Sequence, residues 1–465
     1  MRRTVVGVLL SAWCCVGAGA QTAPLVKRID AAVEGERQHE HVPGVAVAVV
    51  RHGRVVLAKG YGEANVEHHV PVTRQTVFQS GSVGKQFTSV AVMLAVEAGQ
   101  LDLDAPLTHY LPEAPASWQA ITPRHLLTHT SGLATYSDRD LNYRADYTED
   151  ELLKVMYRLP LEFPPGERWS YSNSGYLVLG ILLHQVTGQF YGDILQARVF
   201  RPLGMPSARI ISESDIVAHR AAGYQRAHGQ LQNQDWVAPS LNTTADGALY
   251  LSLEDYLAWD AGLRRRTILT PASWTQIYTP VTLKSGRTYP YGFGWNVERM
   301  GQGFWYHHGG SWQGFRVQVS RYGPDELTVI VLANLAEASP ARFVDAIVAV
   351  VDPLLPRLEP QSPLPEQDPA LAQRVHQLLG DLAAGRLSQA NLPKMRRDFF
   401  PEELAADREL VEPLGEPQRL DLVSRRELGD DVEYGYRVHY AQRTLRLSVN
   451  LTPQAEVAEL YLESD

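Results

Sequence analysis

Apolar positions recur at two different spacings along this chain, and the change of spacing separates expected helices from expected strands. Leu25, Ile29 and Val33 repeat every four residues among charged neighbours, which is typical of one buried helical face. Two short runs rich in valine and alanine, 45–50 and 55–58, then flank a His-Gly turn. Because such runs around a tight turn favour strand pairing, the sequence predicts a first helix followed by a β-hairpin.

The helical spacing returns at Val83 and continues through Phe87, Val90 and Leu94, so a helix with one buried face is expected to open at Ser82. From there to about residue 285 the chain is expected to be mainly helical and irregular, because proline and glycine interrupt it often. Candidate helices in this region are 122–129, 149–157, 174–187, 192–200, 253–264 and 271–277.

Strand patterns return late, at 304–307, 315–319 and 327–332, and a helix is expected over 340–351. An isolated hairpin is unstable in water, so the early hairpin and the late strands most economically form one antiparallel sheet. The helical region is then an insertion packed on one side of that sheet. The interface between sheet and insertion is the expected place for an active site.

Six prolines stand between residues 353 and 369, a density that suits neither a helix nor a central strand. This stretch is predicted to be a semi-rigid linker after a main domain of residues 21–352. Residues 370–465 begin with a helical pattern and continue with runs that alternate apolar and polar residues, as one-sided antiparallel strands do. The predicted fold class is therefore α+β: an antiparallel sheet flanked by helices, an all-helical subdomain, and a small α+β accessory domain.

The N-terminus has the composition of a secretory leader. Basic residues, an apolar run and a small-residue cleavage site before Gln21 predict that residues 1–20 are a signal peptide. Both cysteines, Cys14 and Cys15, fall inside it, so the mature protein is expected to have no thiol, disulfide or cysteine metal site. A lipoprotein anchor at Cys14 is the rival interpretation, but Trp13 stands where a small residue is expected. No later stretch is long and apolar enough to span a bilayer, so a periplasmic or secreted bacterial protein is expected.

Length and charge narrow the function classes. A chain of 465 residues can hold two or three domains and a large core. Its net charge of −9 argues against nucleic acid or an anionic membrane surface as the main partner. A small-molecule or peptide-like substrate is expected instead, with no cofactor; the oligomeric state is left open.

Ser82 and Lys85 form the first chemical motif. At the start of a helix, free backbone N–H groups favour negative charge that develops on a bound oxygen. Lys85 lies one turn after Ser82 and on the same side, within reach of its hydroxyl. A lysine that is desolvated or beside another cation can remove a serine proton near neutral pH, so the pair is sufficient for nucleophilic catalysis.

Tyr171 and Asn173 could complete such a site. A phenol beside an ammonium is drawn toward ionisation, so Tyr171 could pass a proton between Ser82 and the leaving group. Asn173 can both donate and accept a hydrogen bond at a substrate amide. Taken alone, this segment is better explained as buried aromatic surface.

A glycine pair follows two histidines at the end of the 304–307 strand. The glycines allow close approach of the backbone at a strand edge, which would place the N–H of Ser311 beside that of Ser82 as two oxyanion donors. His308 is assigned to the site because it stands two residues before Gly310. Strand alternation alone leaves His307 as the alternative.

Three short motifs stand in the order and at the separations found in a known superfamily: Ser82-x-x-Lys85, Tyr171-x-Asn173 and His308-x-Gly310. They resemble the motifs of the serine β-lactamases and penicillin-binding proteins. The flanking stretches 78–88 and 125–133 are similar to signatures of the branch that holds class C β-lactamases, carboxylesterases and D-amino-acid peptidases. The likeness covers roughly residues 25–350.

This resemblance implies an acyl-enzyme on Ser82, activation by Lys85 coupled with Tyr171, and deacylation by water. It also implies a sheet flanked by helices beside an all-helical subdomain. β-Lactamases and transpeptidases typically carry a lysine at the first position of the third motif, whereas His308 is mostly neutral at pH 7. The histidine form resembles the esterase and D-aminopeptidase members, so the favoured function is a secreted serine hydrolase that cleaves an ester or amide bond.

Two other functions stay open. One is a β-lactamase or DD-peptidase proper, acting on β-lactams or peptidoglycan stems, against which His308 weighs. The other is a catalytically silent protein that binds peptidoglycan or peptide, against which the complete set of motif residues weighs. His125 and His129 are four residues apart and could bind a metal on a helix, but no glutamate follows His125 and the family signature already accounts for both.

Overall fold

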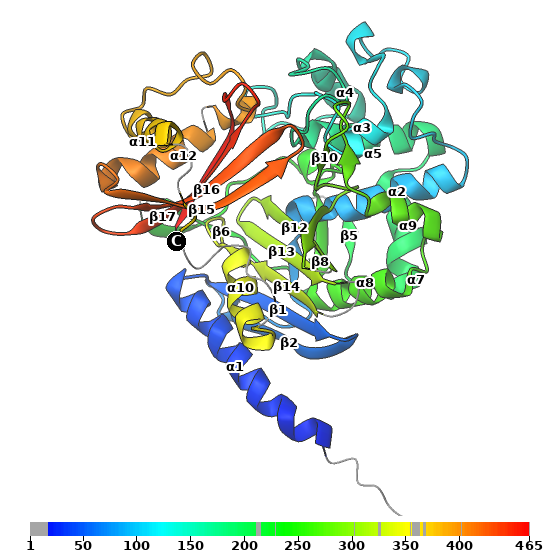
Figure 1. The fold of residues 1–465 in the computed structure, drawn as a ribbon. Helices are drawn as coiled ribbons and strands as arrows, with labels where there is room; N and C mark the ends of the chain where they lie inside the picture. The colour runs from blue at the N-terminus through cyan, green and yellow to red at the C-terminus, as the bar shows by residue number, and fades with distance from the viewer. Residues whose placement is uncertain are drawn as a thin grey trace, which may run out of the picture.

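A seven-stranded antiparallel sheet organises the larger part of the chain (Figure 1). The structure is a computed structural model that describes residues 17–464 except 211–214, 228, 302, 324–326, 354, 356–362, 366–368 and 401. In spatial order the strands are β11 (Asn296–Met300), β12 (Gly303–Trp312), β13 (Phe315–Tyr322), β14 (Leu327–Ala333), β1 (Gly44–Arg51), β2 (Arg54–Asn65) and β3 (Val70–Pro71).

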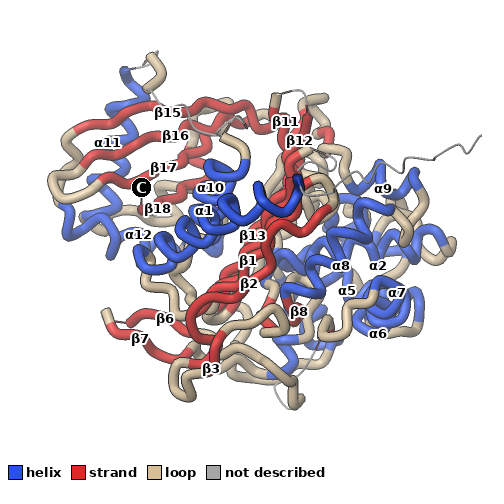
Figure 2. The backbone as a smooth tube through the Cα atoms, turned by 90° about the horizontal axis from the view of Figure 1, so that it is seen from below, coloured by secondary structure: helices blue, strands red, loops and turns tan. Residues whose placement is uncertain are grey.

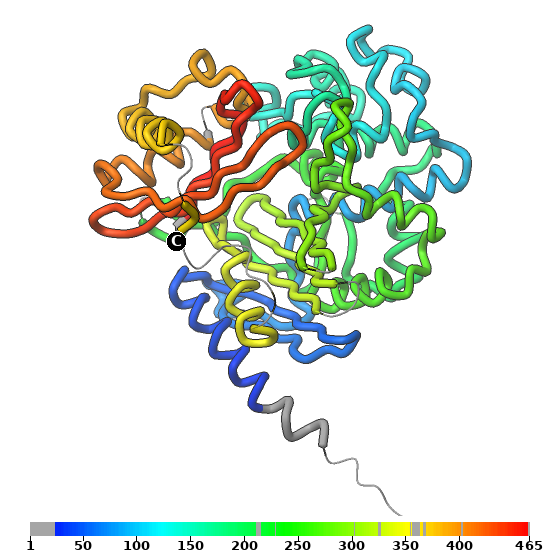
Figure 3. Tube along the Cα trace, in the orientation of Figure 1, coloured from blue at the N-terminus to red at the C-terminus, as the bar shows by residue number. Residues whose placement is uncertain are grey.

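The early hairpin and the late strands are neighbours in this sheet, which confirms the prediction that they pair. β1 is hydrogen-bonded to β2 on one side and to β14 on the other. Figure 3 shows the blue β1–β2 hairpin beside the yellow-green strands that come much later in the chain. β1 is buried on both faces, because its alanines contact one hydrophobic cluster and its alternate valines contact another.

Helices cover both faces of the sheet. α1 (Gly17–His39) and α10 (Pro340–Val351) lie side by side against the face that carries the valines of β1 (Figures 1 and 2). The opposite face carries the mainly helical insertion, as predicted. Its helices are α2 (Lys85–Glu97), α3 (Pro123–Leu127), α4 (Glu149–Arg158), α5 (Asn173–Thr187), α6 (Tyr191–Leu195), α7 (Arg201–Leu203), α8 (Leu253–Arg265) and α9 (Pro271–Ile277).

Small sheets join the helices of this insertion. β4 and β5 flank β8, and two further pairs of strands form short ribbons. The bounds of these strands are β4 (Val77–Gln79), β5 (Arg209–Ile210), β6 (Tyr224–Ala227), β7 (Gln230–Asn233), β8 (Leu249–Ser252), β9 (Val281–Thr282) and β10 (Thr288–Tyr289).

The start of α2 differs from the prediction. Ser82 lies in a 3₁₀ turn, Gly81–Gly84, and the α-helix begins only at Lys85. The expectation of a single buried face was wrong as well, because every residue of 85–95 is buried. α2 runs between the sheet and the helices of the insertion, so its polar positions are buried too and bond to neighbours: the Thr88 hydroxyl donates to the Ala245 carbonyl at 2.6 Å.

The C-terminal part has its own core. α11 (Pro369–Ala383) and α12 (Glu402–Val411) pack on a four-stranded antiparallel sheet of β15 (Arg419–Leu428), β16 (Asp431–His439), β17 (Thr444–Leu451) and β18 (Val457–Ser464). This is the small α+β unit that the sequence predicts, and we call it the accessory domain. Most of the predicted linker 353–369 lies outside the described residues, as do residues 1–16 of the predicted signal peptide.

The turn between β15 and β16 contacts the main domain next to β10. Leu428 belongs to one apolar cluster with Tyr289 and Tyr291, and the Gly429 N–H donates to the Thr288 carbonyl at 3.0 Å. The accessory domain therefore packs directly against the segment that leads into β11. Among the described helices, none combines the length and the apolar character that crossing a bilayer requires.

Candidate active site

Ser82 and Lys85 are brought together by local geometry. In a 3₁₀ turn, residues three apart eclipse one another, so the lysine stacks above the serine. Lys85 Nζ lies 3.0 Å from Ser82 Oγ, 2.8 Å from Asn173 Oδ1 and 2.5 Å from the carbonyl oxygen of Asp246. The lysine has no exposed surface, whereas Ser82 is partly exposed and can be reached by a substrate.

Burial changes the acid–base properties of this amine. It lowers the pKa of Lys85 to about 7, and the negative charge of Asp246 opposes part of that change. Two of the three oxygens around Nζ are carbonyl oxygens, which only accept hydrogen bonds. In the neutral amine both N–H groups can point to these carbonyls, and the nitrogen lone pair then faces the Ser82 hydroxyl.

Asn173 and Tyr171 are positioned by the start of α5. The Ser172 hydroxyl caps this helix by accepting the Gly175 N–H at 3.3 Å, which fixes Asn173 at the first turn. Tyr171 precedes the cap, and Lys85 Nζ lies 4.8 Å from the centre of its ring. The Tyr171 hydroxyl is buried and has no hydrogen-bond partner of regular geometry among the described residues.

The sequence-based expectation for the Tyr171 phenol was wrong in direction. Burial raises the pKa of Tyr171 above its usual value, and the hydroxyl of Ser82 offsets only part of the increase. Lys85 Nζ lies over the Tyr171 ring, 4.8 Å from its centre, and its charge contributes little to the pKa of the phenol. Lys85 is accordingly the better proton acceptor in the unliganded site, and Tyr171 is a neutral hydroxyl.

The end of β12 is an open edge that faces the Ser82 turn. β11 pairs with β12 only as far as His307, which leaves residues 308–312 without a strand on that side. A side chain at Gly310 would collide with the Ser80 carbonyl, and one at Gly81 would collide with the Ser311 N–H. The two backbones therefore approach one another as closely as they do because both positions are glycine.

His307 and His308 point to opposite faces of β12. His307 stacks on Trp305 and its Nε2 lies 3.1 Å from a Glu298 carboxylate oxygen. The His308 ring lies 6.2 Å from that of Tyr171, centre to centre, on the side of Lys85. Burial, and secondarily the Lys85 charge, lowers the pKa of His308 to about 3, so its ring is neutral.

Three residues at this site were not identified as part of it from the sequence. Asp246 supplies the carbonyl next to Lys85, and its carboxylate accepts the Tyr136 hydroxyl at 2.6 Å. His129 and Tyr291 lie behind His308, with Tyr291 Oη 2.9 Å from His308 Nε2. His129 stood inside a recognised signature stretch, which was a usable signal; Asp246 and Tyr291 carried none.

The rings of His125 and His129 accept hydrogen bonds from different backbone N–H groups. His125 Nδ1 accepts the Thr122 N–H at 3.2 Å in a helix cap, and His129 Nδ1 accepts the Ser172 N–H at 3.1 Å. Within the part of the chain that the structure describes, no group of three or more His, Cys, Asp or Glu side chains is arranged to hold a metal ion. The signature is thus explained by helix capping and by support of the Tyr171 segment.

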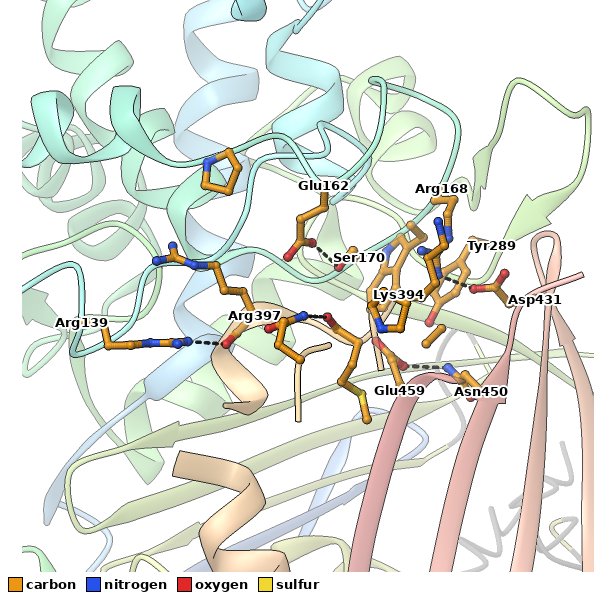
Figure 4. Close-up of a pocket in the computed structure, with 16 residues that line it drawn as sticks. Arg139, Glu162, Arg168, Ser170, Tyr289, Lys394, Arg397, Asp431, Asn450 and Glu459 are labelled. Atoms are coloured by element: carbon orange, nitrogen blue, oxygen red, sulfur yellow. Dashed lines mark hydrogen bonds and ion pairs between the residues drawn. The ribbon is translucent and has the colours of Figure 1, made fainter. Parts of the chain in front are cut away.

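Two hollows lie near these residues. A small recess of about 30 Å³ is lined by Ser82, Asn173, Ser311, Trp312 and neighbouring residues. A larger cavity of about 350 Å³ lies between the main and accessory domains, where Trp169, Ser170 and Tyr289 face Lys394 and Glu459 (Figure 4). Ser82 and Asn173 line the smaller hollow, and none of the residues of the three motifs lines the larger one, so we take the smaller hollow as the candidate active site.

Comparison with known proteins shows the family of this chain. The family described as Beta-lactamase matches residues 29–351, a range that includes the three motifs that begin at Ser82, Tyr171 and His308. The chain belongs to the beta-lactamase family. Its relatives include D-aminopeptidases, and it is accordingly a serine hydrolase.

Three proteins illustrate what this beta-lactamase-family enzyme is similar to. It is 27% identical over 383 residues to penicillin-binding protein 4* of Bacillus subtilis, covering 75% of this chain and 84% of the relative. It is 29% identical to a D-aminopeptidase of Gluconobacter oxydans over 72% of this chain, and spans 64% of that relative's length. The octameric penicillin-binding protein homologue of Pyrococcus abyssi shares the fold over 95% of this chain and 98% of its own, with a TM-score of 0.62 and 21% identity.

Proposed function

We propose that this enzyme hydrolyses amide or ester bonds through an acyl-enzyme on Ser82. The observation that carries the proposal is the 3.0 Å contact between Ser82 Oγ and a fully buried Lys85 Nζ whose pKa is lowered to about 7. A lysine with that pKa is half neutral at pH 7 and can act as a general base there. A silent binding protein would have no need of a fully buried lysine amine, whose charged form is costly to keep out of water.

In the first step the Ser82 proton passes to Lys85 while Oγ bonds to the substrate carbonyl carbon. The carbonyl oxygen becomes an oxyanion, and the backbone N–H groups of Ser82 and Ser311 are the proposed donors to it. The neutral Tyr171 hydroxyl then gives its proton to the leaving nitrogen or oxygen and takes one back from Lys85. The carbon–leaving-group bond breaks, and water hydrolyses the Ser82 ester by the same route in reverse.

The substrate class we propose is a peptide-like amide, with Asn173 holding the substrate amide next to the bond that is cleaved. D-Aminopeptidases among the relatives support an amide of a D-amino acid. A β-lactam or a D-alanyl-D-alanine stem is a weaker candidate, because those substrates carry a carboxylate and the neutral His308 ring supplies no charge to meet it.

The nucleophile is tested by intact-mass spectrometry after incubation with a fluorophosphonate. The unmodified enzyme should gain one adduct and Ser82→Ala none. Ser80→Ala is the matched control, because Ser80 is a buried serine two residues away whose hydroxyl donates to the Gly247 carbonyl at 3.1 Å. Labelling of Ser82→Ala at the normal rate would remove Ser82 from the mechanism.

The substrate class is tested with a panel of D- and L-alanine p-nitroanilides, a D-alanyl-D-alanine peptide and nitrocefin. The D-anilide should give the highest kcat/KM. Faster turnover of nitrocefin or of the D-alanyl-D-alanine peptide would favour the β-lactamase or DD-peptidase alternative.

We also propose that the enzyme is exported and that residues 1–20 are removed. The support is the leader-like composition of this segment. The mass of the protein recovered from a bacterial periplasm or medium should correspond to a chain that begins at Gln21. A cell-associated protein that keeps residues 1–20 would contradict this.

A further inference from the structure

A chain of hydrogen bonds connects His308 to the segment that carries Tyr171. It begins at the backbone N–H of Ser172, which lies 3.1 Å from His129 Nδ1. It continues from His129 Nε2 to Tyr291 Oη at 3.3 Å and from Tyr291 Oη to His308 Nε2 at 2.9 Å. It ends where His308 Nδ1 lies 2.6 Å from the Gly309 carbonyl oxygen.

The two backbone groups at the ends fix the direction of every bond between them. The Ser172 N–H can only donate, so His129 Nδ1 accepts and the proton of a neutral His129 is on Nε2. The Gly309 carbonyl can only accept, so His308 Nδ1 carries a proton. His129 Nε2–H then donates to Tyr291, and the Tyr291 hydroxyl donates to the free nitrogen of His308.

From this geometry we infer that Tyr291 and His129 are positioning residues that hold His308 in its Nδ1–H tautomer, with Nε2 occupied by the Tyr291 hydroxyl. Both ring nitrogens of His308 are then used by the protein, and neither is available to the substrate. The inference rests on the proposed function, because it assigns His308 the task of forming a fixed, uncharged wall beside the Ser82–Lys85 pair.

An uncharged ring matters at this point because of what faces it. The titratable groups around His308 are Lys85, Tyr171, Tyr291, His129 and His307, and Lys85 is the one that is partly charged at pH 7. A second cation beside Lys85 would change the protonation of the proposed base, and a rotated His308 ring would change the shape of the site next to Tyr171. The hydrogen bond that the Tyr291 hydroxyl donates favours a His308 ring whose Nε2 has no proton, and it holds that ring against rotation.

The accessory domain supports Tyr291 from the outer side. Leu428, from the turn between β15 and β16, shares an apolar cluster with Tyr291 and Tyr289. The Trp169 ring stacks on Tyr289 with 4.0 Å between ring centres and also lies against His129. Both members of the chain are therefore packed between the proposed catalytic residues and the domain interface, which leaves their rings little freedom to turn.

The tautomer can be measured directly on the unmodified enzyme. In protein labelled with ¹⁵N-histidine, the ring nitrogens of His308 should show a neutral ring with the proton on Nδ1 at pH 7, and those of His129 a neutral ring with the proton on Nε2. The signals are assigned from the spectra of His308→Asn and His129→Asn. A charged His308 at pH 7, or a proton on its Nε2, overturns the inference whatever the enzyme's activity.

Tyr291→Phe tests the consequence for catalysis. Loss of one neutral hydrogen bond should lower kcat/KM about threefold to tenfold at pH 8. Because His308 Nε2 then has no hydrogen-bond donor, the ¹⁵N signals should show a mixture of the two neutral tautomers. An unchanged tautomer in Tyr291→Phe overturns the inference.

Tyr289→Phe is the matched control. It removes a tyrosine hydroxyl two residues away that lines the domain-junction cavity and makes no hydrogen bond to either histidine. Its kcat/KM and its His308 signals should stay those of the unmodified enzyme. If Tyr291→Phe fails to fold, the tautomer of His308 in the unmodified enzyme still tests the inference. If Ser82 is not labelled by the fluorophosphonate, the proposed function is wrong, whereas the ¹⁵N measurement of the His308 tautomer is unaffected. The failure of the proposed function and the failure of this inference can therefore be distinguished.

Discussion

Raising the pH from 6 to 8 should accelerate acylation of Ser82 about tenfold. The proposed base is the neutral form of Lys85, and burial lowers the pKa of that group to about 7. The neutral fraction is then roughly one tenth at pH 6, one half at pH 7 and nine tenths at pH 8. Tyr171 and His308 do not titrate in this interval, because burial moves the pKa of the phenol upward and that of the imidazole to about 3.

The assay is the second-order rate of fluorophosphonate labelling, followed by intact mass at intervals of half a pH unit. This probe is uncharged over the whole range, so the profile reports groups of the free enzyme. Asp246→Asn provides an internal check of the electrostatics. Because the negative charge of Asp246 raises the pKa of Lys85, its removal should move the midpoint of the profile to lower pH.

Two results would refute this reasoning. A labelling rate that is constant from pH 6 to 8 would mean that Lys85 does not titrate there or is not the base. A midpoint near 10.5, the value of an ordinary lysine, would mean that water reaches the amine and that the burial on which the argument depends is absent in solution.

Four further changes test separate parts of the structure. Lys85→Met should abolish turnover and raise the free energy of unfolding by at most about 5 kcal/mol. The pKa of Lys85 is 10.5 in the unfolded chain and about 7 in the folded protein, so this gain is full below pH 7 and disappears as the pH rises to 10.5. Denaturant unfolding at pH 7 and at pH 10 checks it. Tyr171→Phe should lower kcat by about 10²–10⁴, the range for a proton-transfer group, and an unchanged kcat would remove it from the mechanism. Gly310→Ala should abolish labelling of Ser82 because its methyl group would collide with the Ser80 carbonyl, and normal labelling would show that the strand edge lies further away. Leu428→Ala should lower the free energy of unfolding by about 2–4 kcal/mol, and with it the thermal midpoint, if the surrounding residues do not close the cavity that the change leaves. It should also reduce turnover, because Leu428 packs against Tyr291. A loss of stability with unchanged kinetics would show that the domain contact is purely structural.

Local patterns account for most of what the sequence predicted correctly. The valine-rich runs of β1 and β14 are buried on both faces, and this composition alone distinguishes a central strand from a surface one. The contact between Ser82 and Lys85 was predictable because the two residues are three positions apart in a helical turn, whatever the rest of the fold does. Helices such as α5 and α10 were located within a residue or so, since a cap or a proline marks where each begins.

Contacts between distant segments account for what was missed. The Asp246 carbonyl meets Lys85 across 161 positions of sequence, and Tyr291 meets His129 across 162. No sequence pattern identifies Asp246 or Tyr291 as a site residue. Asp246 contacts Lys85 through its backbone carbonyl, which any residue could supply, and Tyr291 is one of many aromatic residues in the chain. The pKa of Tyr171 is raised because the phenol is buried by segments that are distant in the sequence, and no spacing in the sequence contains that information.

The burial of α2 on all sides, which the sequence did not predict, is what allows the chemistry proposed for Lys85. The apolar spacing from Val83 to Leu94 predicts a helix with one buried face, and such a helix would leave Lys85 partly in water with an ordinary pKa. The structure buries α2 on all sides, because polar residues such as Thr88 also find partners inside the protein. A neutral amine next to Ser82 at pH 7 requires that complete burial. It follows that substitutions which open the outer side of α2 to water should reduce activity at neutral pH and restore it at high pH, even where Ser82 and Lys85 are untouched.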